Sequence, residues 1–191
     1  MNFKRTTILI VCFCGTMALF AGTNCVSPNM PGGYKLSYKK DINCADTPLT
    51  RQVDSVVVLK SKRELLVFRA KNLLKVYHVS LGSAPVGPKH FKGDYKTPEG
   101  VYHIFDKNPH SQYHKNLGIS YPSDADRQYA QNSGRETGGD VKIHGIVNGN
   151  TDPEQLYQDS DWTWGCIALT NREIDELYTH VQVGTIINIL P

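Results

Sequence analysis

The sequence lacks a strong excess of charge of either sign. Its 191 residues include 21 Lys and Arg and 18 Asp and Glu, so the formal net charge at pH 7 is only +3. No block of consecutive basic residues stands out either. Proteins that bind nucleic acids usually present a basic face or tail, so we expect no nucleic-acid partner.

Beyond its N-terminus the sequence also lacks long apolar runs. No later segment approaches the roughly 20 apolar residues that a membrane-spanning helix needs. There is no internal repeat and no low-complexity segment, and 40% hydrophobic and 20% charged residues are ordinary for a globular protein. This length fits one domain with extensions rather than two full domains.

The one long apolar run lies at the N-terminus. Lys4 and Arg5 precede T-T-I-L-I-V-C-F-C-G-T-M-A-L-F, and small residues follow that run. A basic start, an apolar stretch of about 15 residues and small residues after it are typical of a secretory signal peptide. An uncleaved N-terminal anchor is the alternative for residues 1–21. In both cases we expect the rest of the chain to be exported, and in the second to be tethered to a membrane.

The chain contains five cysteines. Cys12 and Cys14 lie within the apolar run. Cys25 follows it, and acylation there competes with a disulfide to Cys44, which an oxidising compartment favours. Cys166 is then left over. A lone thiol in an exported protein needs a reason, and the alternatives are a buried side chain and a nucleophile.

Residues 22–52 have no regular hydrophobic pattern, and S-P-N-M-P-G-G-Y within them carries prolines and glycines that interrupt structure. We interpret this segment as an irregular arm or linker and residues 53–191 as the folded domain. β-branched and aromatic runs within that domain predict strands. They cover residues 55–60, 64–69, 74–81, 101–105, 141–144 and 184–190. The first three indicate an antiparallel meander.

Two capping patterns predict short helices. Ser123 is the N-cap expected for S-D-A-D-R-Q-Y-A-Q-N, with Gly134 as the stop. T-N-R-E, from Thr170, matches a capping box, and Ile174 and Leu177 then lie on the buried face. Residues 106–140 otherwise look polar and irregular. The expected fold class is mostly β with a minor α+β character, a β-sandwich or small barrel-like sheet pair with two short helices.

Cys166 lies in D-W-T-W-G-C-I-A-L-T-N, and His144 lies upstream in K-I-H-G. A cysteine nucleophile needs a base, because a free thiol with a pKa of about 8.5 is mostly protonated at neutral pH. His144 ends a predicted strand and Cys166 precedes a predicted helix, so both can project from one edge of a sheet. Gly145 and Gly165 leave room for close backbone approach, and the W-G-C turn can direct N–H groups at an oxyanion.

These motifs resemble the active-site motif of the L,D-transpeptidase family (YkuD-type catalytic domain). That motif has a His-Gly pair, a spacer, and then Ser/Thr-x-Gly-Cys with an apolar residue, here H-G and T-W-G-C-I. G-D-Y-K-T-P-E-G-V-Y is similar to the family's Thr-Pro-x-Gly-x-Tyr/Phe segment, and L-G-I-S-Y-P and G-G-D-V-K-I-H-G resemble segments of one bacterial branch. The resemblance extends over residues 53–191.

The resemblance implies a peptidoglycan L,D-transpeptidase with a β-sandwich fold, located in the periplasm or cell envelope, without a cofactor. Cys166 matches the nucleophile that attacks the bond between diaminopimelate and D-alanine in a stem peptide, and His144 matches the base. The thioester then passes to an amine, giving a 3–3 cross-link or attaching a lipoprotein, or passes to water. Gly145 would orient His144 through its carbonyl, and Trp164 and Gly165 would belong to the oxyanion region.

The sequence departs from the commonest family pattern twice. Trp164 stands where many members have histidine, which leaves His144 as the base. Ala168 stands where many have arginine, which leaves open how a substrate carboxylate is bound. Arg127 and Arg135 are alternative candidates for binding that carboxylate. The competing interpretation is that both side chains lie on a solvent-exposed helix face and bind no substrate.

Tyr121, His114 and Thr163 are weaker candidates for substrate contacts. His110 and His114 are four residues apart, but polar surroundings favour a loop there, so we expect no metal site. Two other functions stay open. One is a cysteine hydrolase on the same scaffold, an L,D-carboxypeptidase or stem-link endopeptidase. The other is a non-catalytic cell-wall-binding protein, which an intact Cys–His pair disfavours.

Overall fold

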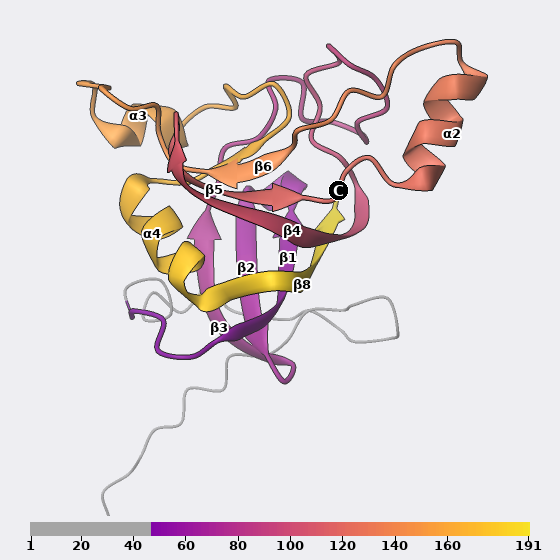
Figure 1. The fold of residues 1–191 in the computed structure, drawn as a ribbon. Helices are drawn as coiled ribbons and strands as arrows, with labels where there is room; N and C mark the ends of the chain where they lie inside the picture. The colour runs from indigo at the N-terminus through magenta and orange to yellow at the C-terminus, as the bar shows by residue number, and fades with distance from the viewer. Residues whose placement is uncertain (1–46) are drawn as a thin grey trace, which may run out of the picture.

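The structure is a computed structural model and describes residues 47–191 (Figure 1). The predicted signal peptide or anchor, most of the predicted arm, and the acylation or disulfide at Cys25 lie outside the described residues. Over the part of the chain that is described, no helix has the length and apolar character to cross a membrane.

Strands dominate the described part of the chain, which confirms the mostly-β prediction. The elements, in chain order, are β1 (Val53–Leu59), the short 3-10 helix η1 (Lys60–Lys62), β2 (Glu64–Arg69), β3 (Asn72–His78), β4 (Gly100–Ser111), β5 (His114–Ile119), α2 (Asp124–Asn132), β6 (Lys142–His144), α3 (Glu154–Gln158), β7 (Ile167–Ala168), α4 (Asn171–His180) and β8 (Val181–Leu190). The strands pair in the order β3-β2-β1-β8-β4-β5-β6-β7.

The sheet curls because β4 is long enough to belong to two parts of it. β1, β2 and β3 form the predicted antiparallel meander. β8 then lies parallel to β1 and antiparallel to β4. Residues 100–103 of β4 pair with β8, whereas its residues from Ile104 onward pair with β5. The sheet therefore continues past β4 into β5, β6 and β7; β5 and β6 are seen just above β4 in Figure 1.

The hydrophobic pattern explains where the core forms. β1 and β2 carry near-continuous apolar runs, V-V-V-L and L-L-V-F, and both faces of these strands are buried. The main core lies inside the curl, where Val56, Val58, Leu65 and Val67 pack with residues of β4 to β8 and α4. A smaller cluster on the other face contains Val57, Leu59, Leu66, Phe68, Leu73 and Val76.

Both capping predictions are confirmed. At α2 the Ser123 hydroxyl accepts the N–H of Asp126 and the Asp126 carboxylate accepts the N–H of Ser123. At α4, Thr170 and Glu173 form the same reciprocal pair. The buried side chains of α4 include Ile174 and Leu177, so this helix closes the core over β5 and β8.

Two features of the fold differ from the sequence prediction. The prediction of irregular chain after residue 105 is wrong, because β4 runs on to Ser111 and β5 follows it. The outward side chains of this hairpin are polar, so the alternation that signals a strand is weak there. The helix α3 was also not expected. None of its residues is buried, so its sequence has no apolar face that would predict a helix.

One carboxylate links three parts of the fold. Glu176 of α4 accepts hydrogen bonds from Lys75 Nζ at 2.7 Å, from Tyr77 Oη at 2.9 Å and from the N–H of Leu49 at 2.5 Å. Burial alone would raise the pKa of Glu176, but these three donors bring it below its usual value. Glu176 therefore joins α4 to β3 and to the residues before β1 as a carboxylate.

Replacing Glu176 with Gln should lower the free energy of unfolding at pH 7 by roughly 2–4 kcal/mol, because Lys75 then loses its buried counter-charge. Because the folded-state pKa is depressed, the stabilisation is present above the usual pKa of 4.5 and is lost as pH falls below it. When urea unfolding is measured at pH 7 and at lower pH, the free energy of unfolding should fall less on acidification in the variant than in the wild type. Glu136→Gln, at a side chain 76% exposed, is the control and should change little.

Candidate active site

Cys166 and His144 come together where β6 and β7 lie side by side. The two strands are parallel, with His144 opposite Ala168. Two residues back along both strands, the same register places Cys166 opposite Lys142. Side chains two residues apart point to the same face of a strand. Cys166 and His144 are therefore diagonal neighbours on one face, as their positions at the ends of predicted elements suggested.

A cavity of about 630 Å³ opens at this edge of the sheet and is lined by both side chains. Its other walls come from the β4–β5 hairpin, the segment before β6 and the turn before β7. They comprise Asn108, His110, Ser111, Gln112, Tyr113, Asn116, Gly139, Asp140, Val141, Lys142, Trp162, Thr163, Trp164 and Gly165. The structure thus places the candidate nucleophile and base in one solvent-connected pocket.

His144 is held in one orientation and one tautomer. Only 5% of it is exposed, and its ring packs against Tyr113 at 4.6 Å and Trp162 at 5.7 Å between ring centroids. Nδ1 lies 2.7 Å from the carbonyl oxygen of Gly145. A carbonyl only accepts, so Nδ1 carries the proton and Nε2 presents its lone pair. A side chain at Gly145 would meet Asn171 Oδ1 at 2.5 Å, which explains the glycine.

The surroundings favour the uncharged form of both groups. Burial lowers the pKa of His144, and the charge of the nearby Lys142 lowers it further. The hydrogen bond to Gly145 raises this pKa but does not outweigh the other two effects. Burial raises the pKa of Cys166, and the Asp140 carboxylate adds to that effect; the Lys142 backbone N–H and the Lys89 charge oppose it. The resting pair is therefore a neutral thiol beside a neutral imidazole, so proton transfer has to accompany nucleophilic attack.

Thr163 shapes the turn that presents the thiol. Its buried hydroxyl accepts the N–H of Gly165 at 3.1 Å and donates to the carbonyl of Cys166 at 2.7 Å. The Gly165 N–H is used in this turn and the Thr163 N–H is bonded to the Leu81 carbonyl, so the N–H groups of Trp164 and Cys166 are the candidate donors to an oxyanion. Trp164 lies on the rim, 80% exposed, and meets the Tyr95 ring edge-on.

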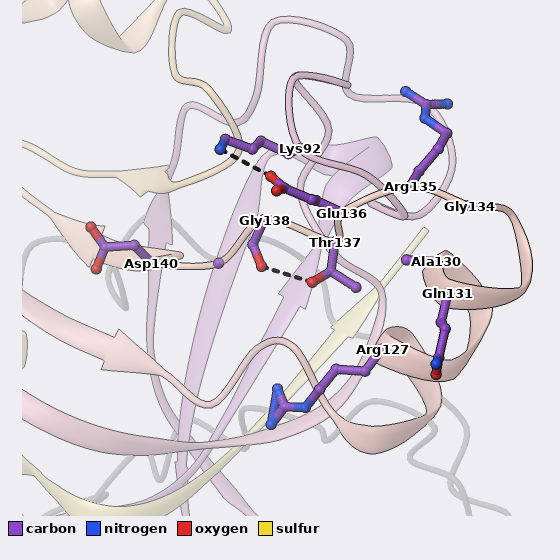
Figure 2. A pocket seen from close by; sticks show the side chains of 11 residues that line it. Lys92, Arg127, Ala130, Gln131, Gly134, Arg135, Glu136, Thr137, Gly138 and Asp140 are labelled. Atoms are coloured by element: carbon purple, nitrogen blue, oxygen red, sulfur yellow. Dashed lines mark hydrogen bonds and ion pairs between the residues drawn. The ribbon is translucent and has the colours of Figure 1, made fainter.

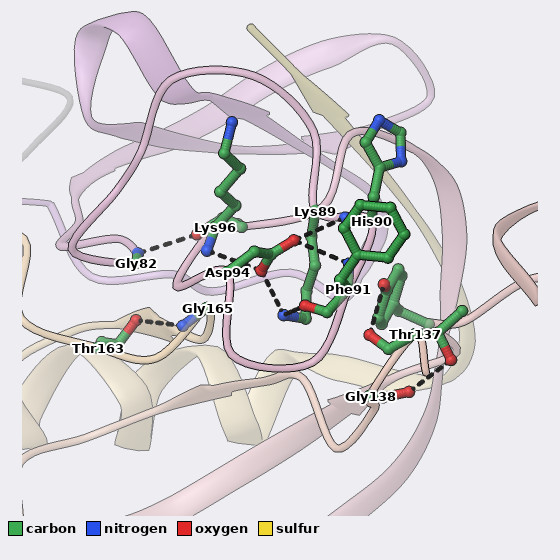
Figure 3. A network of polar contacts seen from close by, with 12 residues as sticks. Gly82, Lys89, His90, Phe91, Asp94, Lys96, Thr137, Gly138, Thr163 and Gly165 are labelled. Atoms are coloured by element: carbon green, nitrogen blue, oxygen red, sulfur yellow. Dashed lines mark hydrogen bonds and ion pairs between the residues drawn. The ribbon is translucent and has the colours of Figure 1, made fainter. Parts of the chain in front are cut away.

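The loop before β4 packs directly on this turn (Figure 3). A Cβ atom at Gly165 would lie 2.6 Å from the carbonyl oxygen of Lys96, and the φ angle of Gly165 is +131°. The loop is held by a buried ion pair between Lys89 and Asp94 at 2.7 Å. Asp94 also accepts three backbone N–H groups of the same loop. The turn that carries the Cys166 thiol thus packs against a loop whose backbone is held in place by Asp94.

The T-P-E-G segment fastens the end of this loop. Thr97 is fully buried, and its Oγ1 accepts the N–H of Gly82 at 3.0 Å. The buried Lys60 donates to the Thr97 carbonyl at 2.9 Å and to Glu99 at 2.8 Å. A side chain at Gly82 would overlap the carbonyl of Tyr95 at 2.2 Å. This motif therefore supports the site without facing the cavity.

Two of the weaker predicted substrate contacts lie outside the cavity. Tyr121 is buried, and its hydroxyl donates to the Thr137 carbonyl at 3.2 Å. His114 points instead to α4, where its Nε2 lies 2.7 Å from Asp175 Oδ1. Neither residue lines the pocket that holds Cys166. The position of this pocket therefore does not support the predicted substrate contacts of Tyr121 and His114.

Sequence reasoning missed the groups that surround the sulfur. The Sγ atom of Cys166 lies 3.8 Å from the carbonyl oxygen of Asp140. The backbone of Asp140 has a positive φ angle of +58°. The Asp140 carboxylate pairs with Lys142 at 2.7 Å. The available signal was the G-G-D sequence directly before the strand that ends at His144. Among residues 47–191, no group of three or more His, Cys, Asp or Glu side chains is placed to hold a metal.

The chain matches the family model of the L,D-transpeptidase catalytic domain (YkuD) over residues 53–189. It is 32% identical over 111 residues to YafK of Escherichia coli (strain K12), whose name assigns it provisionally to the L,D-transpeptidases. That alignment covers 57% of this chain and 37% of YafK.

Solved structures with the same fold include the helical cell shape determining protein Pgp2 from Campylobacter jejuni, with a TM-score of 0.54 and 24% identity. Bd1075 from Bdellovibrio bacteriovorus has a TM-score of 0.51 and 22% identity. The matches cover 78% and 75% of this chain, and 52% of each of those chains. At these identities they support the fold alone, and this chain spans about half of their length.

Replacing Gly165 with Ala should lower the free energy of unfolding by roughly 2–4 kcal/mol, because the new methyl group needs both a strained φ and room that the Lys96 carbonyl occupies. Gly149→Ala is the matched control, since Gly149 has a φ of +79° with no atom within 4 Å of the added carbon. It should lose only about 1 kcal/mol. Equal losses in urea unfolding would show that contact with Lys96 does not constrain the turn.

The alkylation rate of Cys166 by iodoacetamide should rise with pH through one apparent pKa above the usual 9.0, since burial disfavours the thiolate. A thiolate–imidazolium pair would instead give a plateau near neutral pH. The Cys166 peptide is followed by mass spectrometry, because the chain has five cysteines. His144→Gln should keep the profile's shape; a wild-type plateau that the variant loses would contradict the neutral pair.

Proposed function

Since the chain belongs to the L,D-transpeptidase catalytic-domain family, we propose that it is a cysteine acyltransferase that acts on peptidoglycan stem peptides in the cell envelope. The observation that supports this most directly is that Cys166, directly before β7, and His144, at the end of β6, line one cavity. His144 keeps Nε2 free as a base, because Nδ1 is bonded to Gly145.

In the first half-reaction the Cys166 sulfur attacks the carbonyl carbon between diaminopimelate and the terminal D-alanine. His144 Nε2 takes the thiol proton as the carbon–sulfur bond forms, and the carbonyl oxygen becomes an oxyanion near the N–H groups of Trp164 and Cys166. The carbon–nitrogen bond then breaks, and His144 returns the proton to the departing amine of D-alanine. A thioester on Cys166 and free D-alanine result.

In the second half-reaction a nucleophile takes the acyl group from Cys166. His144, again neutral, accepts a proton from the incoming amine as that amine attacks the thioester carbonyl, and the thiol is restored when the intermediate collapses. An amine on another stem gives a 3–3 cross-link, and an amine on a lipoprotein gives a wall-attached protein. If water attacks instead, the enzyme acts as a carboxypeptidase.

Incubating the purified protein with stem peptides that end in D-alanine should release D-alanine and add the mass of the acyl group to Cys166. Cys166→Ala should form no adduct. His144→Gln should slow acylation by roughly 10²–10⁴-fold, because the sulfur then lacks its base. His78→Gln, at an exposed histidine of β3, is the matched control and should leave the rate unchanged. Intact-mass spectrometry measures each outcome.

Muropeptide analysis of treated sacculi separates the acceptors. 3–3 dimers indicate transfer between stems, trimmed or severed stems indicate hydrolysis, and protein bound to or released from the wall indicates chemistry at a lipoprotein. Binding to sacculi without D-alanine release or an adduct would replace the proposed enzyme with a non-catalytic wall-binding protein.

A further inference from the structure

A second cavity adjoins the one that holds Cys166. It measures about 810 Å³ and lies between α2 and the glycine-rich segment 134–140 (Figure 2). The two cavities share Gly139 and Asp140 as lining residues. The carbonyl of Asp140 is also the group that the thiol contacts. A peptide bound at Cys166 can therefore continue over residues 139 and 140 into the second cavity.

The charges that line this second cavity are predominantly positive. They belong to Lys92, Arg127, Arg135, Glu136 and Asp140. Lys92 and Glu136 pair with each other at 3.0 Å, and Asp140 pairs with Lys142 of β6 at 2.7 Å. After these pairs are taken out, the charge that remains is that of the two arginines.

The two arginines come from opposite walls and differ in how they are held. The Arg135 guanidinium lies over the Phe91 ring at 3.8 Å, a cation–π contact that fixes it while leaving its N–H groups available. Arg127 meets only Asp124, one turn earlier in α2, at 3.6 Å, and both side chains are strongly exposed. An exposed contact of that length contributes little, so the Arg127 guanidinium is the group that is available to bind an anion.

The cavity around the thiol offers no comparable cation among its described lining residues. Lys142 there is paired with Asp140, and burial keeps His144 neutral. Ala168, opposite His144, is 3% exposed and exchanges backbone hydrogen bonds with Ser80, so this position is closed. In the second cavity, by contrast, a carboxylate on a bound peptide meets Arg127, whose only ion pair among the described residues is long and exposed, and Arg135, which stacks on a ring.

We propose that Arg127 forms a subsite for a carboxylate of the acyl-donor peptide, and that Arg135, whose guanidinium points away from that of Arg127 in Figure 2, adds positive charge on the facing wall. This inference rests on the proposed function. Guanidinium groups bind carboxylates through paired N–H donors. The acceptor is a less suitable occupant, because its reacting amine is positively charged until it loses a proton and the arginines repel it. The subsite thus selects a donor with a carboxylate beyond the residue that is attacked.

The test uses a donor stem peptide and analogues in which each carboxylate, other than that of the leaving D-alanine, is replaced in turn by a carboxamide. Arg127→Gln should lower kcat/KM for the unmodified donor by roughly tenfold, and Arg135→Gln by less. One carboxamide analogue should reproduce the loss with wild-type protein. With that analogue, Arg127→Gln should cause little further loss, because the pair is already broken.

Two controls separate binding from damage to the site. Arg172→Gln, at an exposed arginine of α4 outside both cavities, should match wild type with every peptide. Iodoacetamide, which is neutral, should alkylate Cys166 in Arg127→Gln at the wild-type rate. If Arg127→Gln matches wild type with every donor while D-alanine is still released, the subsite is wrong and the proposed function stands.

If the wild-type protein releases no D-alanine and forms no acyl-enzyme, the proposed function fails first. Calorimetric titration of the donor into Cys166→Ala, with and without Arg127→Gln, then decides the subsite separately. A loss of affinity of roughly tenfold with the arginine change supports it. Equal affinity, or no binding in either variant, overturns it.

Discussion

The close packing of the Gly165 turn against the carbonyl of Lys96 is the constraint on which the site depends. A turn with a positive φ and no room for a Cβ atom fixes both the residue type and the direction in which Cys166 leaves the turn. The opposing loop must be equally fixed, and the buried pair of Lys89 and Asp94, which lies behind the Gly165 turn, meets this need. The position of the candidate nucleophile is therefore set by packing between two loops.

Desolvation governs the chemistry in the same way. It acts in opposite directions on the two pKa values, raising that of Cys166 and lowering that of His144. The charged pair is disfavoured unless a carbonyl group is present, because attack on its carbon moves the negative charge from the sulfur to the carbonyl oxygen. Because the thiolate is also the form that is oxidised, a raised pKa makes the resting thiol of Cys166 less prone to oxidation.

The sequence predicted those parts of the molecule whose signals are local. Strands with buried apolar runs and helices with capping boxes were found because their patterns depend on neighbouring residues alone. β5 was missed because its first three residues, His114 to Asn116, are polar and hide the strand pattern, although its partner β4 directly precedes it in a hairpin. Cys166 and His144 were identified from flanking glycines and element ends, whereas placing Tyr121 and His114 requires knowing which way two chain segments fold. No local pattern contains that information.

The proposed catalytic pair and the proposed carboxylate subsite lie on different parts of the fold. Cys166 and His144 lie at the edge formed by β6 and β7, where Ala168, opposite His144, is buried. Arg127 and Arg135 are on α2 and the segment after it, an exposed part of the surface with only Ala130 of α2 buried. If the proposed subsite binds the donor, substitutions there should change which carboxylates are recognised without disturbing the neutral thiol and imidazole. A change in substrate preference should then follow from charge changes at Arg127 or Arg135 rather than in the W-G-C turn.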